Sequence, residues 1–296
     1  MKTSTGKWWL LLVLGFTIPS VSIRELEATP QTQDSQRKIV SDDFINSRKE
    51  GHKSSVGRKP RRTYRLASNP AAGARSTTFM QLGITIWRLR SARDGDSDRR
   101  ALVREKKGAT WAAERVESDG KFREGDYVRL SVESPRTGYL YVIDRDLFAD
   151  GTTGAPMLIF PWSGADNKLF PGRLIDIPDQ EDDPAYFTAR LTGSNQVGEL
   201  LTFIVTTSPL EVTVADKPSK IDPGHFTGWQ KSWGGATERY EMENGAGELW
   251  TKEEQAAAGK GRRQLTRDDP APQTIYRVFT TENGGMLATL VLRYGK

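Results

Sequence analysis

The sequence predicts a mostly β protein: an antiparallel β-sandwich, immunoglobulin-like in general architecture, with one short helix in a long connection. Three observations favour this fold class. From about residue 79 onward, apolar side chains recur at every second position, which is the period of a β-strand. The apolar runs are short and follow one another without a helical pattern between most of them. Gly, Pro, Asn and Asp separate the runs, and short consecutive strands joined by turns are typical of sandwiches.

The strands are expected to differ in how deeply they are buried. The alternation in residues 82–89 changes parity midway, which indicates a bulge in the first strand. Residues 128–133 alternate apolar and polar side chains and predict a half-buried strand. Residues 138–143 are apolar at both parities and predict a central strand covered on both faces. Further short strands are expected at residues 156–161, 174–177, 187–191, 200–206, 275–279 and 286–294.

Two local signals refine the last third of the chain. Asn283-Gly284 lies between the last two predicted strands and supplies the positive φ angles that a hairpin turn requires. In the long connection between residues 212 and 272, Thr251-Lys252-Glu253-Glu254 matches a helical capping box, and Gly259 is suited to end the helix. We therefore expect a hairpin at the carboxyl end and a short helix from about Thr251.

The first 22 residues have the pattern of a secretory signal peptide. Lys2 and Lys7 give a basic start, residues 8–18 are apolar, and the small residues Ser20 and Ser22 follow. Cleavage is expected directly after Ser22. The alternative is an uncleaved membrane anchor, but the apolar run is shorter than the roughly 20 residues that a spanning helix needs. We therefore expect an exported protein, located in the periplasm, on the cell envelope or outside the cell, with no transmembrane helix after signal removal.

Residues 23–78 are predicted to be a disordered basic linker, and residues 79–296 a single β-sandwich domain. Residues 23–77 are rich in polar side chains and carry twelve Lys and Arg against six Asp and Glu, a charge of +6. The leader adds +2, so residues 78–296 carry −3 of the total +5. The linker is either a solvated spacer or a contact for anionic surfaces. An acidic domain behind an export signal argues against nucleic-acid binding.

Composition excludes several kinds of site. The chain contains no Cys, so disulfides, thiolate zinc sites and a Cys nucleophile are excluded. His52 and His225 are its two histidines, too few for a multi-histidine metal site, and neither lies in a recognisable catalytic motif. We therefore expect no cofactor and no metal, and the sequence identifies no catalytic residue.

Three aspartates form one candidate cation site. Asp144 and Asp146 close a predicted strand and Asp150 opens the next turn, so their oxygens could hold Ca²⁺. Their spacing does not match the twelve-residue calcium loop, and Arg145 lies among them. The alternative is therefore a solvated, salt-bridged turn. Carboxylate pairs of this kind also leave open a hydrolase that acts on envelope or extracellular polymers.

Three tryptophans form a candidate binding surface. Trp229 and Trp233 lie four residues apart in a Gly-flanked segment that is expected to be a loop, and Trp162 follows a predicted strand end. Exposed aromatic faces could stack on sugar rings or dock a peptide, so the possible partner is an envelope protein or a glycan. The alternative is that the long connection uses these rings to cover an open sheet face.

Five motifs follow one another in the central part of the chain, roughly residues 79–210: Gly125-Asp126 before a strand, Gly138-Tyr139-Leu140-Tyr141, Asp150-Gly151, Phe160-Pro161, and Asp166-Asn167. In their order and spacing they resemble the bacterial domain of unknown function 4384, in a stand-alone, signal-bearing form. It implies an exported or envelope-associated β-rich domain and carries over no site residues. The expected function is a non-catalytic binding or structural module of the cell envelope.

Overall fold

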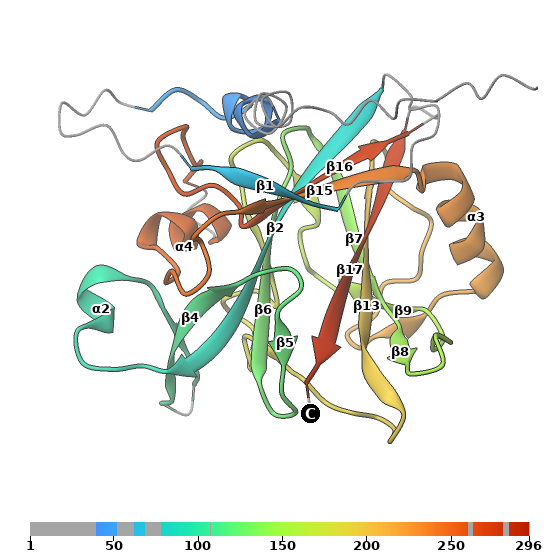
Figure 1. Ribbon diagram of the computed structural model, residues 1–296, viewed down its shortest axis with the longest axis horizontal. Helices are drawn as coiled ribbons and strands as arrows, with labels where there is room; N and C mark the ends of the chain where they lie inside the picture. The colour runs from blue at the N-terminus through green and yellow to red at the C-terminus, as the bar shows by residue number, and fades with distance from the viewer. Residues whose placement is uncertain are drawn as a thin grey trace, which may run out of the picture.

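The computed structural model describes residues 40–51, 62–68, 78–106, 108–259, 263–280 and 284–295. In these residues the chain is mostly β, and its two large sheets pack face to face as the sequence predicts (Figure 1). Pairing is antiparallel throughout both sheets except between β17 and β5, the last element of the second sheet. The β-sandwich is therefore confirmed.

Among the described residues, nine strands form the first sheet. Its main path runs through β1 (Tyr64–Ser68), β15 (Ala236–Met242), β16 (Thr274–Phe279), β2 (Phe79–Ser91), β4 (Thr110–Val116) and β3 (Leu102–Arg104). Branching from β2 are β6 (Tyr127–Glu133) and its two short partners, β11 (Ile175–Ile177) and β12 (Phe187–Thr188).

Eight described strands form the second sheet. Its main path runs through β14 (Ser219–Lys220), β9 (Met157–Phe160), β7 (Gly138–Asp144), β13 (Gln196–Thr206), β17 (Gly285–Tyr294) and β5 (Lys121–Phe122). Two short strands pair beside this path, β10 (Lys168–Leu169) with β7 and β8 (Asp146–Phe148) with β13.

Apolar side chains of one parity from each sheet meet between the sheets and form the main core. Ile84 and Leu130 enter it from the first sheet, and Leu140 and Phe203 from the second; each is at most 1% exposed. Complete burial of such side chains stabilises the fold by roughly 1.5–3 kcal/mol each. As predicted, β7 is a central strand, and it lies between β9 and β13.

The outer faces of both sheets are covered as well. Helix α3 (Pro223–Trp233) packs on the second sheet and lies at the right of Figure 1. Helices α2 (Asp96–Arg99) and α4 (Lys252–Ala258) lie at the left, beside the first sheet. Helix α4 begins with the predicted capping box and ends at Gly259. None of the described helices is long and apolar enough to span a bilayer.

Coverage of both faces explains two predictions that were wrong. The register of β2 with β16 and with β6 shows no shift, so the first strand contains no bulge. Its parity change arises because Trp87 and Leu89 enter a second apolar cluster on the outer face. Likewise, β6 is not half-buried: its polar side chains Arg129, Ser131 and Glu133 are at most 4% exposed.

The predicted C-terminal hairpin is also wrong. Strand β16 belongs to the first sheet and β17 to the second, so the chain crosses between the sheets at this point. The turn residues 281–283 lie outside the described residues. The Asn-Gly signal reports a local backbone preference, whereas the sheet that each strand joins depends on the core that it faces.

Two segments of the predicted disordered linker are ordered on the domain, so that part of the prediction is wrong. Residues 40–46 are helical, and Phe44 is completely buried in a cluster on the first sheet. Arg48 forms a buried ion pair with Glu133, whose Oε2 is 2.6 Å from its Nη2. Residues 64–68 form β1, which pairs with β15. The signal peptide and the rest of the linker lie outside the described residues.

Candidate functional site

The structure does not bring the three predicted aspartates together. Asp144 ends β7 and Asp146 begins β8, opposite Glu199 of β13. Asp150 instead lies in an exposed turn, where its Oδ1 accepts hydrogen bonds from the hydroxyl and the amide of Thr152 at 2.6 and 2.9 Å. The described residues contain no group of three or more His, Asp or Glu side chains placed to hold a metal ion.

Asp144 nevertheless has an unusual environment. Burial, followed by the nearby charges of Glu199 and Asp146, raises its pKa to about 7. Its Oδ1 is buried without a hydrogen-bond partner among the described residues. Burial also raises the pKa of Glu199, whose carboxylate accepts a hydrogen bond from the hydroxyl of Tyr294. A carboxyl group that titrates near neutrality can transfer protons, and this keeps the hydrolase alternative in view.

The three predicted tryptophans lie in two different layers. Trp229 and Trp233 project from α3, with ring centroids 6.4 Å apart and planes at 13°. Both are half-buried and pack on the cluster that covers the outer face of the second sheet. Trp162 packs against the core between the sheets, in edge contact with Phe160.

These contacts favour the covering role that the sequence left open. The ring of Trp233 lies so close to Gly285 that a Cβ on this glycine would be 2.9 Å from three ring atoms. The segment around Trp229 and Trp233 is a helix rather than the expected loop. Asp222 caps it by accepting a hydrogen bond from the amide of His225, and Pro223 occupies its first turn.

A cavity of about 480 Å³ that the sequence did not reveal lies on the outer side of the first sheet. Three parts of the chain line it: the segment from α2 to β3, the inner strand β6, and α4 with the residue before its cap. Gln180, from the connection after β11, completes the wall. Among the described residues, the charged side chains that line it are all cationic: Arg100, Arg104, Arg129 and Lys252.

Arg129 is the most deeply buried of these cations, with 2% of its surface exposed. Its Nη2 donates to Asp176 Oδ2 at 3.0 Å and to the carbonyl of Pro178 at 3.5 Å. Burial lowers the pKa of Arg129, and the charge of Asp176 opposes this effect. Burial likewise raises the pKa of Asp176 to about 6, against the influence of Arg129. Ser131 donates a second hydrogen bond to Asp176 at 2.5 Å.

Trp250 lies beside Arg129 in the cavity wall. The Arg129 guanidinium carbon is 4.7 Å from the centroid of the Trp250 ring, which is a cation–π contact. Trp250 is 1% exposed, and its indole Nε1 is buried with no hydrogen-bond partner among the described residues. Buried N–H groups are nearly always bonded, so an unpartnered one in a cavity wall needs an explanation.

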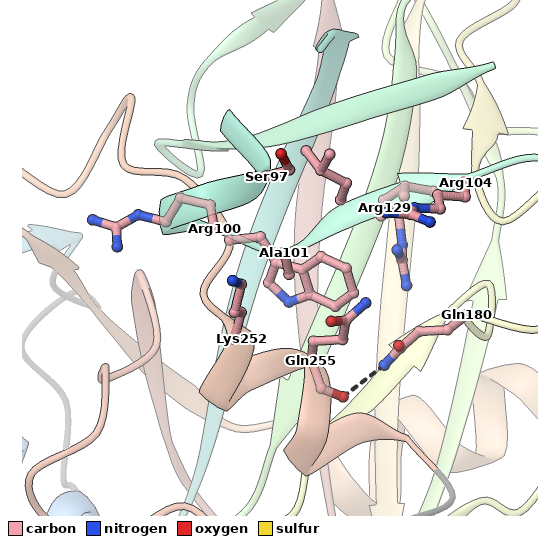
Figure 2. Close-up of a pocket in the computed structure, with 11 residues that line it drawn as sticks. Ser97, Arg100, Ala101, Arg104, Arg129, Gln180, Lys252 and Gln255 are labelled. Atoms are coloured by element: carbon pink, nitrogen blue, oxygen red, sulfur yellow. Dashed lines mark hydrogen bonds between the residues drawn. The ribbon is translucent and has the colours of Figure 1, made fainter. Parts of the chain in front are cut away.

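The rim of the cavity is polar. Figure 2 shows Lys252 and Gln255 on α4 and, across the opening, Arg104 and Arg129. The side-chain amide of Gln180 donates to the backbone carbonyl of Gln255 at 2.9 Å, drawn as a dashed line in Figure 2. The arrangement offers hydrogen-bond donors and positive charge to a molecule that enters.

Sequence reasoning missed the cavity because its residues come from distant parts of the chain. The alternating pattern of β6 assigned Arg129 to a solvated face. The one signal that could have located it is the pair of oppositely charged residues Arg129 and Asp176, at polar positions of two predicted strands that the structure shows to be paired. Trp250 directly precedes the capping box, which shows that it lies just before α4 but gives no indication of what its ring contacts.

Comparison with family models, curated proteins and solved structures found no match for this chain. The resemblance to the domain of unknown function 4384 therefore stays a prediction from the sequence.

Proposed function

We propose that the protein is an exported, non-catalytic β-sandwich that binds a ligand of the cell envelope or its surroundings in the cavity around Arg129 and Trp250. The observation that carries this proposal is the cavity itself. Its volume of about 480 Å³ lies in the range of small-molecule sites. Its wall contains one buried donor without a partner among the described residues, the indole N–H of Trp250, and a purely structural role gives no reason to leave it unbonded.

Export is supported by the signal-peptide pattern of the first 22 residues. Amino-terminal sequencing of the protein recovered outside the cytoplasm tests cleavage after Ser22.

We also propose that the basic linker contacts anionic surfaces. Three of its described arginines are already paired within the domain: Arg48 with Glu133, Arg62 with Glu248 and Arg65 with Glu117.

A hydrolase is the second candidate, and one observation favours it: the neutral-range pKa of Asp144 beside Glu199. A protonated acid next to an ionisable partner is the pair that glycoside hydrolysis uses. Neither residue lines the cavity described above. This candidate requires that Asp144→Asn abolish turnover of a glycan or peptide substrate.

The binding proposal is tested by filling the cavity. Gln255→Trp places a large ring at a half-buried position of α4, where Gln255 lines the cavity. The matched control is Gln230→Trp on the exposed side of α3, outside the cavity. All three proteins are applied to the same glycan arrays and panels of small metabolites.

We expect the wild type and Gln230→Trp to retain the same compound, and Gln255→Trp to lose at least about tenfold in affinity, or about 1.4 kcal/mol. Equal binding by Gln255→Trp would place the ligand elsewhere on the molecule. If the wild type retains no compound, the binding role itself is wrong.

A further inference from the structure

We propose that the cavity binds a small molecule through an oxyanion, a carboxylate or phosphate group held by Arg129 and Trp250 and attracted by the cations of the rim. This inference rests on the proposed function and names the ligand chemistry of the same site. It follows from three properties of the cavity: the sign of its charge, its unused hydrogen-bond donors and its size.

Among the described residues, the charged side chains of the lining have one sign. Arg104 and Lys252 are exposed at the rim and Arg129 lies at the base, and the described lining residues include no Asp or Glu. The carboxylate of Asp176 contacts Arg129 but is not among the described lining residues. Two further acids, Asp179 and Asp182, act on Arg129 through their charge. An anion in the cavity therefore meets cations first, and a cation would be repelled.

Donors at the base of the cavity are left over after every described hydrogen bond is counted. The hydrogen bonds that Arg129 donates to the described residues all come from its Nη2. The donors on its Nε and Nη1 have no partner among these residues. Trp250 adds the indole N–H. Guanidinium and indole nitrogens donate and do not accept, so a group with several acceptor oxygens is suited to bond them together.

Carboxylate and phosphate are the groups whose oxygens match a guanidinium fork, and hydrogen bonds to charged acceptors are about twice as strong as neutral ones. A cavity of about 480 Å³ accommodates such a group with a sugar-sized body attached. The amides of Gln180 and Gln255 lie at the wall, where hydroxyl groups of that body could bond. A neutral sugar would leave the Arg129 and Trp250 donors without a charged acceptor.

The experiment measures binding of four probes to the full-length protein by calorimetry: inorganic phosphate, glucose 6-phosphate, glucuronate and glucose. We expect the charged probes to bind and glucose not to bind. A preference for glucose 6-phosphate over glucuronate identifies a phosphate group as the ligand's anion, and the reverse preference identifies a carboxylate. Rising salt should weaken binding of either probe, because the rim charges are exposed.

Two sets of variants localise the anion. Arg104→Gln/Lys252→Gln removes the exposed rim charges, and Arg123→Gln/Lys231→Gln removes two exposed charges of the same types outside the cavity. We expect the first pair to weaken binding roughly three- to tenfold, in line with exposed ion pairs, and to flatten the salt dependence. The second pair should bind like the wild type.

Trp250→Phe removes the indole N–H and keeps an aromatic ring beside Arg129. Thermal unfolding establishes whether the variant is folded. We expect its affinity for the charged probe to be roughly tenfold lower than that of the wild type, because one hydrogen bond to a charged group is lost.

Three results would overturn the inference: glucose binding as tightly as the charged probes, no binding of any charged probe at millimolar concentration, or equal binding by the rim variant and its control. A neutral compound that binds the wild type but not Gln255→Trp would leave the proposed function standing while this inference fails.

Discussion

Most buried charges among the described residues are paired, and the exceptions are the residues to examine. Three arginines on the outer face of the first sheet are each at most 3% exposed. Each contacts a buried carboxylate, and the nitrogen–oxygen distances are 2.6, 2.5 and 3.0 Å for Arg48–Glu133, Arg115–Glu254 and Arg129–Asp176. Removing one member of such a pair leaves the other as a buried charge without a counter-ion, which destabilises the fold. Asp144 differs, because burial and the charges of other carboxylates have the largest effects on its pKa.

Asp144 should make stability depend on pH. Its pKa is raised from an ordinary value near 3.8 to about 7. Folding therefore favours the protonated acid, whose stabilising contribution is complete below about pH 4 and is lost as the pH rises through about 7. Asn mimics the neutral acid at every pH. We expect the melting temperatures of Asp144→Asn and wild type to agree near pH 4, with the variant higher at about pH 8 by roughly 2–4 °C or more, the effect of about 1 kcal/mol.

The control is Asp150→Asn in the same loop region. Hydrogen bonds from Thr152 lower the pKa of Asp150, so its ionised form is the one that the folded state favours. Its replacement should bring no gain in melting temperature at about pH 8. If the difference between Asp144→Asn and wild type does not grow from pH 4 to pH 8, the raised pKa of Asp144 is wrong.

At the scale of elements, α4 shows how one side chain connects a helix to a sheet. Glu254 completes the capping box, because its Oε2 accepts a hydrogen bond from the Thr251 amide at 3.0 Å. Its Oε1 accepts a hydrogen bond from the Arg115 guanidinium of β4 at 2.5 Å. The same helix presents Lys252 and Gln255 to the cavity. The cap therefore sets the position of part of the proposed binding site.

Thr251→Ala should destabilise the protein by about 1 kcal/mol, because the amide of Glu254 loses the Thr251 hydroxyl that it bonds at 3.1 Å. Thr251→Ser keeps this hydroxyl and should retain most of the wild-type stability. The measurement is the free energy of unfolding in urea. Equal losses in the Ala and Ser variants would show that the lost methyl group, rather than the cap, is responsible.

Elements were predictable from the sequence where their signals are local. The capping box located α4 because all its contacts lie within four residues. Helix α3 was missed even though Asp222-Pro223 opens it and Phe226, Trp229 and Trp233 follow at helical spacing. Its two glycines and the flanking Gly234-Gly235 favour a loop by propensity, and packing on the second sheet overrides them.

At the scale of the whole molecule, the strand period predicted the sandwich but not the layers outside it. Alternation reports only that one face of a strand is apolar. It could not show that the polar face of β6 would be covered, since the partners of that face come from residues 40–51, from β11 and from Trp250 before α4. Arg48 and Glu133 are 85 positions apart, and no local pattern connects them. The cavity shares this origin, because it lies where those outer layers leave space above β6.

The segment from residue 40 to residue 51 is therefore expected to be part of the fold rather than a spacer. Arg48 is held by both oxygens of Glu133 and by the carbonyl groups of Thr266, Asp269 and Pro270. Arg48→Met leaves Glu133 buried without its cation and should lower the free energy of unfolding by roughly 3–5 kcal/mol. Arg62→Met, in an exposed pair with Glu248, should cost less than about 1 kcal/mol.

The double variant Arg48→Met/Glu133→Met distinguishes two contributions to stability: the contacts of Arg48 with backbone carbonyl groups, and the neutralisation of the buried Glu133 carboxylate. Replacing both members of a buried ion pair by apolar side chains is often neutral, so the double variant should be more stable in urea than Arg48→Met alone. That order would show that most of the single-variant loss is the stranded carboxylate of Glu133. If Arg48→Met costs no more than Arg62→Met, the segment contributes little to the fold, and residues 40–51 return to the role of linker. If the double variant is the less stable one, the carbonyl contacts of Arg48 anchor the segment, because only the guanidinium makes them.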